Sequence, residues 1–244
     1  MAEERNQQDT ATHGVTKFSD WTDAEFQALL TFRHEGKSVE HVTPKVAPVD
    51  WSEHVTEVRD QGAECGSSWA FAVVEAVETT HEVNCGIMDE LSVQQLLDCD
   101  TSSFGCMGGY LDSAAEYMIK TDKWNTWADY PYTGKRQDCQ SNTGTIDLCV
   151  SGHAETAGVE ELHAAIMRGA PAVAADATTW VTYQEGILSN CGTNVNHPVQ
   201  VVGIDADGNY KLRNTWGTDW GENGYIRIAA GNTCGIASIV SSPY

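Results

Sequence analysis

Three polar residues, Ser68, His197 and Asn214, are of the types that together perform nucleophilic catalysis. A hydroxyl nucleophile needs a base within hydrogen-bond reach, and the base needs a third group that fixes its tautomer. Each residue alone also has a plainer explanation, because serine often caps a helix, a single histidine is usually structural, and asparagine is common in turns. The three can act together only if the fold brings their segments to one place.

Ser68 begins a segment that is predicted to form a buried helix. The residues from Ser68 to about Glu82 are apolar nearly all round in the first three turns, which is typical of a helix inside a protein. The first turn of such a helix carries unpaired N–H groups and the positive end of the helix dipole. The Ser68 hydroxyl is therefore expected to lie beside these N–H groups and the positive end of the dipole.

The other expected elements are short. Helices are predicted at residues 22–31, from Ser92 onward, at 111–119 and at 159–167, and strands at 172–175, 199–204, 210–213 and 224–228. Ser92 and Gln95 have the spacing of a capping box. His197 precedes the second predicted strand and Asn214 follows the third. Because helices come first and strands later, we expect an α+β fold with a helical lobe and a β lobe.

The composition excludes several classes of function. With 35 acidic and 14 basic residues, the net charge is −21, which would repel the phosphate backbone of a nucleic acid. No run of 18 apolar residues occurs, and the first residues lack an apolar region, so we expect neither a membrane span nor a signal peptide in this sequence. Eight cysteines indicate an oxidising compartment and a disulfide framework. They form no CxxC pair and no close cluster with histidine, so no metal site is expected.

Four motifs resemble those of the papain-like cysteine peptidases, the family of papain and the cathepsins. The segment QGAECGSSWAF at residues 61–71 resembles the family's nucleophile segment, and His197 and Asn214 follow at the family's spacing. NTWGTDWGENG at residues 214–224 is similar to its Asn-Ser-Trp-Gly block. GCMGG at 105–109 is similar to its Gly-Gly segment, and Tyr-Pro-Tyr at 130–132 to a further block.

The resemblance implies a two-lobe fold with the active site in a cleft. Residues 46–155 would form a mainly helical lobe and residues 156–244 a mainly β lobe, similar to a β-barrel. HGVTKFSDWTDAEF at residues 13–26 resembles the end of the family's inhibitory propeptide, so residues 1–45 are interpreted as a partial propeptide. The long helical half that normally comes before this motif is not found in the sequence.

The resemblance also assigns roles to single residues. Ser68 occupies the nucleophile position and His197 the acid/base position, while Asn214 would hold the imidazole under the shield of Trp216. Gln61 would donate to the oxyanion together with the Ser68 N–H. Further substrate-binding residues would be Gly108, Gly109, Tyr110, Leu111, Ala175, Asn196, Pro198 and Ile239. The apolar members of this set imply a pocket for a bulky hydrophobic side chain just upstream of the cleaved residue.

The resemblance pairs six of the eight cysteines. It implies the disulfides Cys65–Cys106, Cys99–Cys139 and Cys191–Cys234, and by elimination alone a fourth bond would join Cys85 to Cys149. It further implies that the protein needs no metal or organic cofactor and acts on protein or peptide substrates. The other partners would be the chain's own propeptide and cystatin-type inhibitors. The protein would be a monomer with a lysosomal, vacuolar or extracellular location.

The sequence departs from the family at two positions. Ser68 stands where the working enzymes have a cysteine, and because a hydroxyl is far too weak an acid to form the thiolate–imidazolium pair, we expect little or no activity. Three explanations stay open: a deliberate Cys-to-Ser exchange in an ordinary protease, a natural serine-bearing relative similar to serine-repeat antigens or silicateins, and a pseudoenzyme that binds peptides. Glu64 is an extra residue between Gln61 and Cys65, which either bulges on the surface or displaces Gln61.

Overall fold

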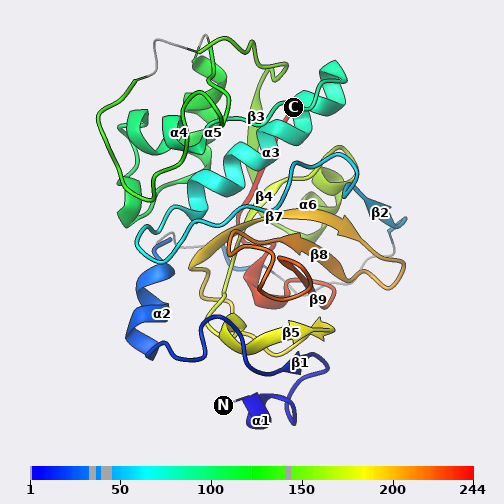
Figure 1. Cartoon of the computed structure of the whole chain (residues 1–244). Coiled ribbons are helices and arrows are strands. Elements are labelled where there is room, and N and C mark those ends of the chain that lie inside the picture. The colour runs from blue at the N-terminus through cyan, green and yellow to red at the C-terminus, as the bar shows by residue number, and fades with distance from the viewer. Residues whose placement is uncertain (1, 33–36, 40–45, 122, 141–143) are drawn as a thin grey trace.

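The computed structural model describes residues 2–32, 37–39, 46–121, 123–140 and 144–244. Helices α4 (Val93–Cys99) and α5 (Leu111–Lys120) lie on one side of the molecule and a twisted sheet on the other, with the longest helix between them (Figure 1). The predicted α+β class is confirmed. Among the described residues, no helix combines the length and the apolar character that a bilayer crossing requires.

The long central helix is α3 (Ser68–Cys85), whose side chains from Ser68 to His81 are all buried. It ends at Gly86, which adopts a left-handed conformation (φ 69°) that costs glycine little. The helix packs against α4 (Val93–Cys99) and α5 (Leu111–Lys120) on one side and against the sheet on the other. Ser92 Oγ accepts the Gln95 N–H and caps α4, as its sequence pattern predicts.

One eight-stranded sheet forms the other half. Its order is β3 (His153–Thr156), β10 (Val240–Pro243), β4 (Ala172–Ala175), β7 (His197–Ile204), β8 (Tyr210–Arg213), β9 (Tyr225–Ile228) and β6 (Ile187–Leu188), with β2 (Val49–Asp50) also paired to β7. The β6–β9 pair is parallel and the other pairs are antiparallel. Helix α6 (Val159–Ile166) packs on this sheet. The strand that was predicted at 199–204 is β7, and it begins two residues earlier than predicted, at His197.

The N-terminal segment lies across both halves (Figure 1). After the short helix α1 (Ala2–Arg5), strand β1 (Thr12–His13) pairs with β5 (Tyr183–Glu185). Helix α2 (Asp23–Leu29) is shorter than predicted, and Thr22 and Glu25 close its capping box. Apolar side chains of this segment are buried in two different cores.

Two buried clusters make up the cores. The helical cluster contains the apolar face of α3 together with α4 and α5, and it includes Phe32. The sheet cluster contains β7, β8 and β9 and includes Phe18, Phe26 and Leu29. The N-terminal segment therefore leaves one core and enters the other between Leu30 and Phe32.

Four disulfides tie the chain together, and the described residues include no free cysteine. The bonds are Cys65–Cys106, Cys85–Cys149, Cys99–Cys139 and Cys191–Cys234, the same four pairs that the sequence analysis named. Cys65–Cys106 joins the segment before Ser68 to the 3₁₀ helix η1 (Gly105–Met107).

Candidate active site

Ser68 is the first residue of α3, and its side chain is fully buried. Among the described residues, no group forms a hydrogen bond with its Oγ. The preceding Ser67 does not cap the helix through its side chain, because its Oγ lies 2.6 Å from the Tyr132 hydroxyl instead. Leaving a buried hydroxyl unpaired costs about 1–3 kcal/mol, so an oxygen in this position at a helix N-terminus marks a candidate reactive site.

His197 begins β7 and Asn214 directly follows β8, so the pairing of these strands places the two side chains together. Asn214 Oδ1 accepts the Thr215 N–H at 2.8 Å, which identifies that atom as the oxygen. His197 Nε2 lies 2.8 Å from the same oxygen and must therefore carry the proton that it donates. His197 Nδ1 is left with its lone pair, and within the described part of the chain it has no hydrogen-bond partner.

Trp216 covers this pair. Its ring centroid lies 4.7 Å from that of His197, and both residues are almost completely buried. Burial lowers the pKa of His197 to about 4, while the hydrogen bond to Asn214 acts in the opposite direction. His197 is therefore a neutral imidazole at neutral pH, with a free basic nitrogen at Nδ1.

The low pKa of His197 has a measurable consequence for stability. Since its folded pKa of about 4 lies below the ordinary value of 6.5, the unfolded chain binds protons more readily between these values. We expect this histidine to remove about 3 kcal/mol of stability as the pH falls from 6.5 to 4. Urea unfolding of the full chain and of His197→Gln across this range measures it, and the variant should lose less stability. Titration of His197 near pH 6.5 by NMR would contradict a buried neutral base.

Gln61 is buried beside the segment that leads to Ser68. Its Nε2 donates to the Cys65 carbonyl at 3.0 Å, and its Oε1 accepts the Thr215 hydroxyl at 2.6 Å. A side-chain amide has two N–H groups, so one further donor is present on Nε2. Glu64 is exposed and Gln61 is buried, which is what the surface-bulge alternative predicts.

The N-terminal segment occupies part of the predicted substrate cleft. Thr31 Oγ1 donates to the Gly66 carbonyl at 2.9 Å, and the Phe32 N–H donates to the Asn196 carbonyl at 3.2 Å. A Cβ atom at Gly108 would lie 2.7 Å from the Thr31 carbonyl oxygen, so this close approach requires glycine there. Gly66 therefore contacts the Thr31 side chain, while Gly108 and Asn196 contact the backbone of Thr31 and Phe32.

The remaining predicted cleft residues differ in their surroundings. Leu111 and Ile239 share the buried helical cluster with Phe32. Ala175 belongs to the sheet cluster, Pro198 is buried and Tyr110 is half-buried. Gly109 packs on Trp69, where a Cβ atom would lie 2.4 Å from the indole ring.

Two residues of the site were not assigned from the sequence. Thr215 holds Gln61 through its hydroxyl, and Tyr132 donates to the Gln61 carbonyl at 2.8 Å. Tyr132 lies in the Tyr-Pro-Tyr block, and Thr215 is the neighbour of Asn214, so both motifs were visible in the sequence. The contacts themselves depend on the fold.

Known proteins resemble this chain over nearly its whole length. Residues 46–244 match the family model described as "Papain family cysteine protease". The chain belongs to this family. The papain-family protein "Cathepsin L 2" of Paramecium tetraurelia is 37% identical over 246 residues, covering 96% of this chain and 78% of that protein.

Solved structures of papain-family precursors share the fold. Digestive procathepsin L 3 from the larval midgut of Tenebrio molitor has a TM-score of 0.85 at 33% identity, covering 99% of this chain and 85% of that chain. Recombinant stem bromelain precursor has a TM-score of 0.86 at 31% identity, and the match covers 99% of this chain and 86% of that chain. These similarities confirm the papain-like α+β fold and the cathepsin L-like character of the chain.

Proposed function

We propose that this chain is a papain-type endopeptidase in an occluded, proform-like state, and that Ser68 in the nucleophile position leaves it inactive or nearly so. The observation that carries this proposal is the hydrogen bond from His197 Nε2 to Asn214 Oδ1. It leaves the basic Nδ1 without a partner among the described residues, and the buried Ser68 Oγ has none there either. We take Ser68 as the residue in the nucleophile position, His197 as the base and Asn214 as the residue that orients the base.

The proposed reaction is acyl transfer to the residue at position 68. A nucleophile there would attack the substrate carbonyl, and His197 would first accept its proton and later protonate the leaving amine. The second Nε2 hydrogen of Gln61 and the backbone N–H of Ser68 would stabilise the oxyanion. A thiol at a helix N-terminus beside histidine ionises readily, but a serine hydroxyl does not, so the serine needs concerted help from His197.

We also propose that residues 1–45 act as a partial inhibitory propeptide over a helical lobe of residues 46–155 and a β lobe of residues 156–244. Residues 33–36 and 40–45 of this propeptide lie outside the described residues. Support comes from the contacts of Thr31 and Phe32 with the cleft and from the pairing of β1 with β5. In addition, Lys17 Nζ lies 2.7 Å from Asp60 Oδ2 and donates to the Trp216 carbonyl at 2.8 Å.

The surroundings of Phe32 support a substrate preference. Phe32 is 3% exposed and shares its buried cluster with Leu111 and Ile239, two residues of the predicted hydrophobic pocket. A bulky apolar side chain just upstream of the cleaved residue would find the same surroundings. Protein substrates, the propeptide and cystatin-type inhibitors are the proposed partners. The disulfides and the cathepsin L relatives support a secretory or lysosomal location.

A non-catalytic peptide-binding protein, whether a natural serine-bearing relative or a pseudoprotease, is the second candidate. It is favoured by the serine itself, because the described residues include no free thiol and Thr31 of the N-terminal segment nevertheless binds the Gly66 carbonyl. The experiment that separates the two proposals exchanges Ser68 for cysteine and measures peptide hydrolysis. Turnover supports the endopeptidase, and a folded but inert variant supports the peptide-binding protein.

Removing the Phe18 side chain should open the cleft. Phe18 is 3% exposed, and its ring makes edge contacts with Trp21, Phe26 and Trp216 at centroid distances of 4.9, 5.4 and 5.1 Å. Phe18→Ala is expected to weaken docking of the segment by about 3 kcal/mol, which corresponds to roughly a hundredfold in affinity.

The measurement is binding of a peptide aldehyde to the full chain, compared with a chain shortened to residues 46–244. Phe18→Ala should bring the affinity of the full chain toward that of the shortened chain. Val15→Ala is the matched control, because Val15 lies in the same segment but is 81% exposed. Equal binding by the unaltered full chain and the shortened chain would show that the segment does not occlude the cleft.

A further inference from the structure

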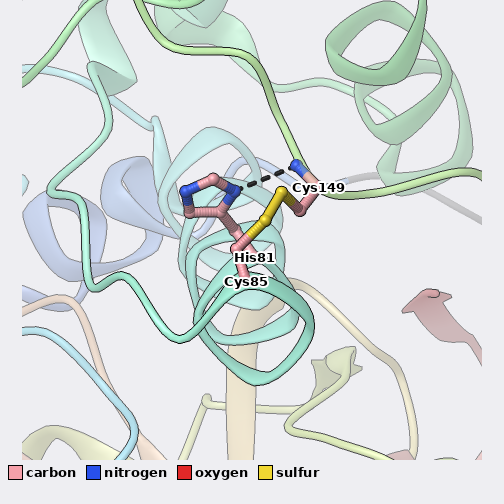
Figure 2. A group of neighbouring side chains, drawn as sticks. All are labelled: His81, Cys85 and Cys149. Atoms are coloured by element: carbon pink, nitrogen blue, oxygen red, sulfur yellow. Dashed lines mark hydrogen bonds between the residues drawn. A yellow bond between two sulfur atoms is a disulfide. The ribbon is translucent and has the colours of Figure 1, made fainter.

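A cluster of one histidine and two cysteines lies far along α3 from Ser68. His81 and Cys85 are one turn apart on this helix, and Cys149 comes from the segment that precedes β3 (Figure 2). One ligand atom of each residue lies within 4.8 Å of the others. Nitrogen and sulfur are the ligands that Zn²⁺ prefers in proteins. Cys85 and Cys149 form a disulfide here, so both sulfurs are engaged.

The hydrogen bonds of His81 determine its tautomer. The Cys149 backbone N–H donates to His81 Nδ1 at 2.9 Å, so this nitrogen carries the lone pair (Figure 2). Nε2 therefore carries the hydrogen, and it lies 3.1 Å from Asp89 Oδ2. A carboxylate behind a histidine is the common arrangement around protein-bound zinc, because it orients the ring and increases its basicity. The Nδ1 lone pair is thus already directed at the residue that supplies one of the two sulfurs.

Among the four disulfides, Cys85–Cys149 is the bond in which neither cysteine is buried. Cys85 is exposed and Cys149 is half-buried. Each of the other three bonds has one cysteine that is at most 7% exposed, namely Cys65, Cys99 and Cys234. Thiol–disulfide exchange requires access of a thiolate to one of the sulfurs. A small thiol is therefore expected to open Cys85–Cys149, and the exposed Cys139 gives it access to Cys99–Cys139 as well.

We propose that reduction of the Cys85–Cys149 bond by a small-molecule thiol creates a Zn²⁺ site formed by His81 Nδ1 and the two cysteine sulfurs. Two molecules of the thiol are oxidised to their disulfide, and the protein bond takes up the two electrons and two protons. Zn²⁺ then binds both thiolates and releases these two protons. The Cys149 N–H turns from Nδ1 to water, and a water molecule completes a tetrahedral set.

The sequence alone predicts no metal site, and the positions of the three residues along the chain show why the proposed site could not be predicted from it. His81 and Cys85 have a spacing of four residues, which places them on one face of a helix. The third ligand is 64 residues away from Cys85 along the chain, so only the fold brings it to this face.

The test is Zn²⁺ binding by the full chain after mild reduction, followed with a chromophoric competitor, and with Co²⁺ as a spectroscopic substitute. We expect one Zn²⁺ per chain once two thiols are titratable, a cobalt–thiolate charge-transfer band, and no binding by the oxidised chain. Asp89→Asn should weaken binding about 10- to 100-fold, and His81→Gln more. His54→Gln is the matched control, because His54 pairs with Glu82 on the same helix at 2.9 Å without a cysteine nearby. It should leave binding unchanged.

Two results would overturn the proposal. One is a reduced chain with two free thiols and unchanged circular dichroism that binds no Zn²⁺. The other is a His81→Gln variant that binds as tightly as the unaltered chain. If reduction opens other disulfides or unfolds the protein, Cys85→His/Cys149→His is measured without reductant. This variant is expected to bind Zn²⁺ through three imidazoles, and a folded variant that does not bind contradicts the geometry.

Discussion

A Ser68→Cys chain shortened to residues 46–244 is expected to hydrolyse peptides at mildly acidic pH in the presence of a mild thiol reductant. The new thiol would lie at the N-terminus of α3, where the helix dipole and His197 both favour the thiolate. Asn214 already holds the imidazole through Nε2, and the free Nδ1 is ready to accept a proton. Removal of the nucleophile from a serine protease costs about 10⁶-fold in turnover, so we expect a gain of about 10⁴- to 10⁶-fold over the Ser68 chain.

Turnover should be measured against a peptide library, with Leu, Val and Phe preferred just upstream of the cleaved residue. Ser67→Cys is the matched control, because it places the same thiol one residue earlier, beside the Tyr132 hydroxyl, and should be inert. Ser68→Cys/His197→Gln should be inert as well, since it lacks the base. A folded Ser68→Cys chain without turnover on any peptide would refute the endopeptidase proposal and favour the peptide-binding protein.

Replacement of Arg213 should destabilise the fold more than most single substitutions. Arg213 and Glu75 are both fully buried, and Arg213 Nε lies 3.3 Å from Glu75 Oε2. Arg213 Nη1 also donates to the Thr56 carbonyl at 2.6 Å. Arg213→Met leaves the carboxylate buried without its partner, and we expect a loss of about 3–5 kcal/mol in the free energy of unfolding. Urea denaturation measures this loss.

The double variant Glu75→Met/Arg213→Met is the control for this prediction. It removes both charges and leaves apolar side chains of similar volume, so it should be more stable than Arg213→Met alone. If the loss of unfolding free energy in the double variant equals the sum of the losses in the two single variants, the two residues do not act as a pair.

The loss in Arg213→Met should also depend on pH. Burial raises the pKa of Glu75 to about 7, although Arg213 and Arg59 both act to lower it. A carboxyl group whose folded pKa lies above its ordinary 4.5 binds its proton more tightly in the folded chain, so its contribution to stability falls as the pH rises from 4.5 through 7. Without Arg213, the free-energy cost of keeping the Glu75 carboxylate buried and ionised is larger, so the variant should lose more stability at pH 8 than at pH 5. The effect is opposite in sign to that of His197.

Much of the fold follows from local sequence patterns. The continuous apolar surface from Ser68 onward predicts α3, because a helix without a polar face has to be buried. The capping pattern at Ser92 predicts the start of α4, and the Ser92 side chain accepts the Gln95 N–H there. These predictions succeed because each depends on residues within one or two turns of each other.

The arrangement of the site could not be obtained in this way. Nothing local shows that His197 faces Asn214, and only the resemblance to the papain family suggested it. Glu75 stands out as a charge within an apolar helix, but its partner Arg213 is on a distant strand. Likewise, the contact of Thr31 with Gly66 depends on where the N-terminal segment lies once both cores have formed. Long-range contacts of this kind are properties of the fold rather than of any short window.

The path of the N-terminal segment has a consequence for how the molecule yields to force or heat. Leu30 is buried in the sheet cluster and Phe32 in the helical cluster, so a single intervening residue, Thr31, connects the two cores across the cleft. Neither half can swing away from the other until at least one of these side chains is withdrawn. Once the segment leaves, this link across the cleft is lost, and the packing of α3 against the sheet is what still holds the two halves together.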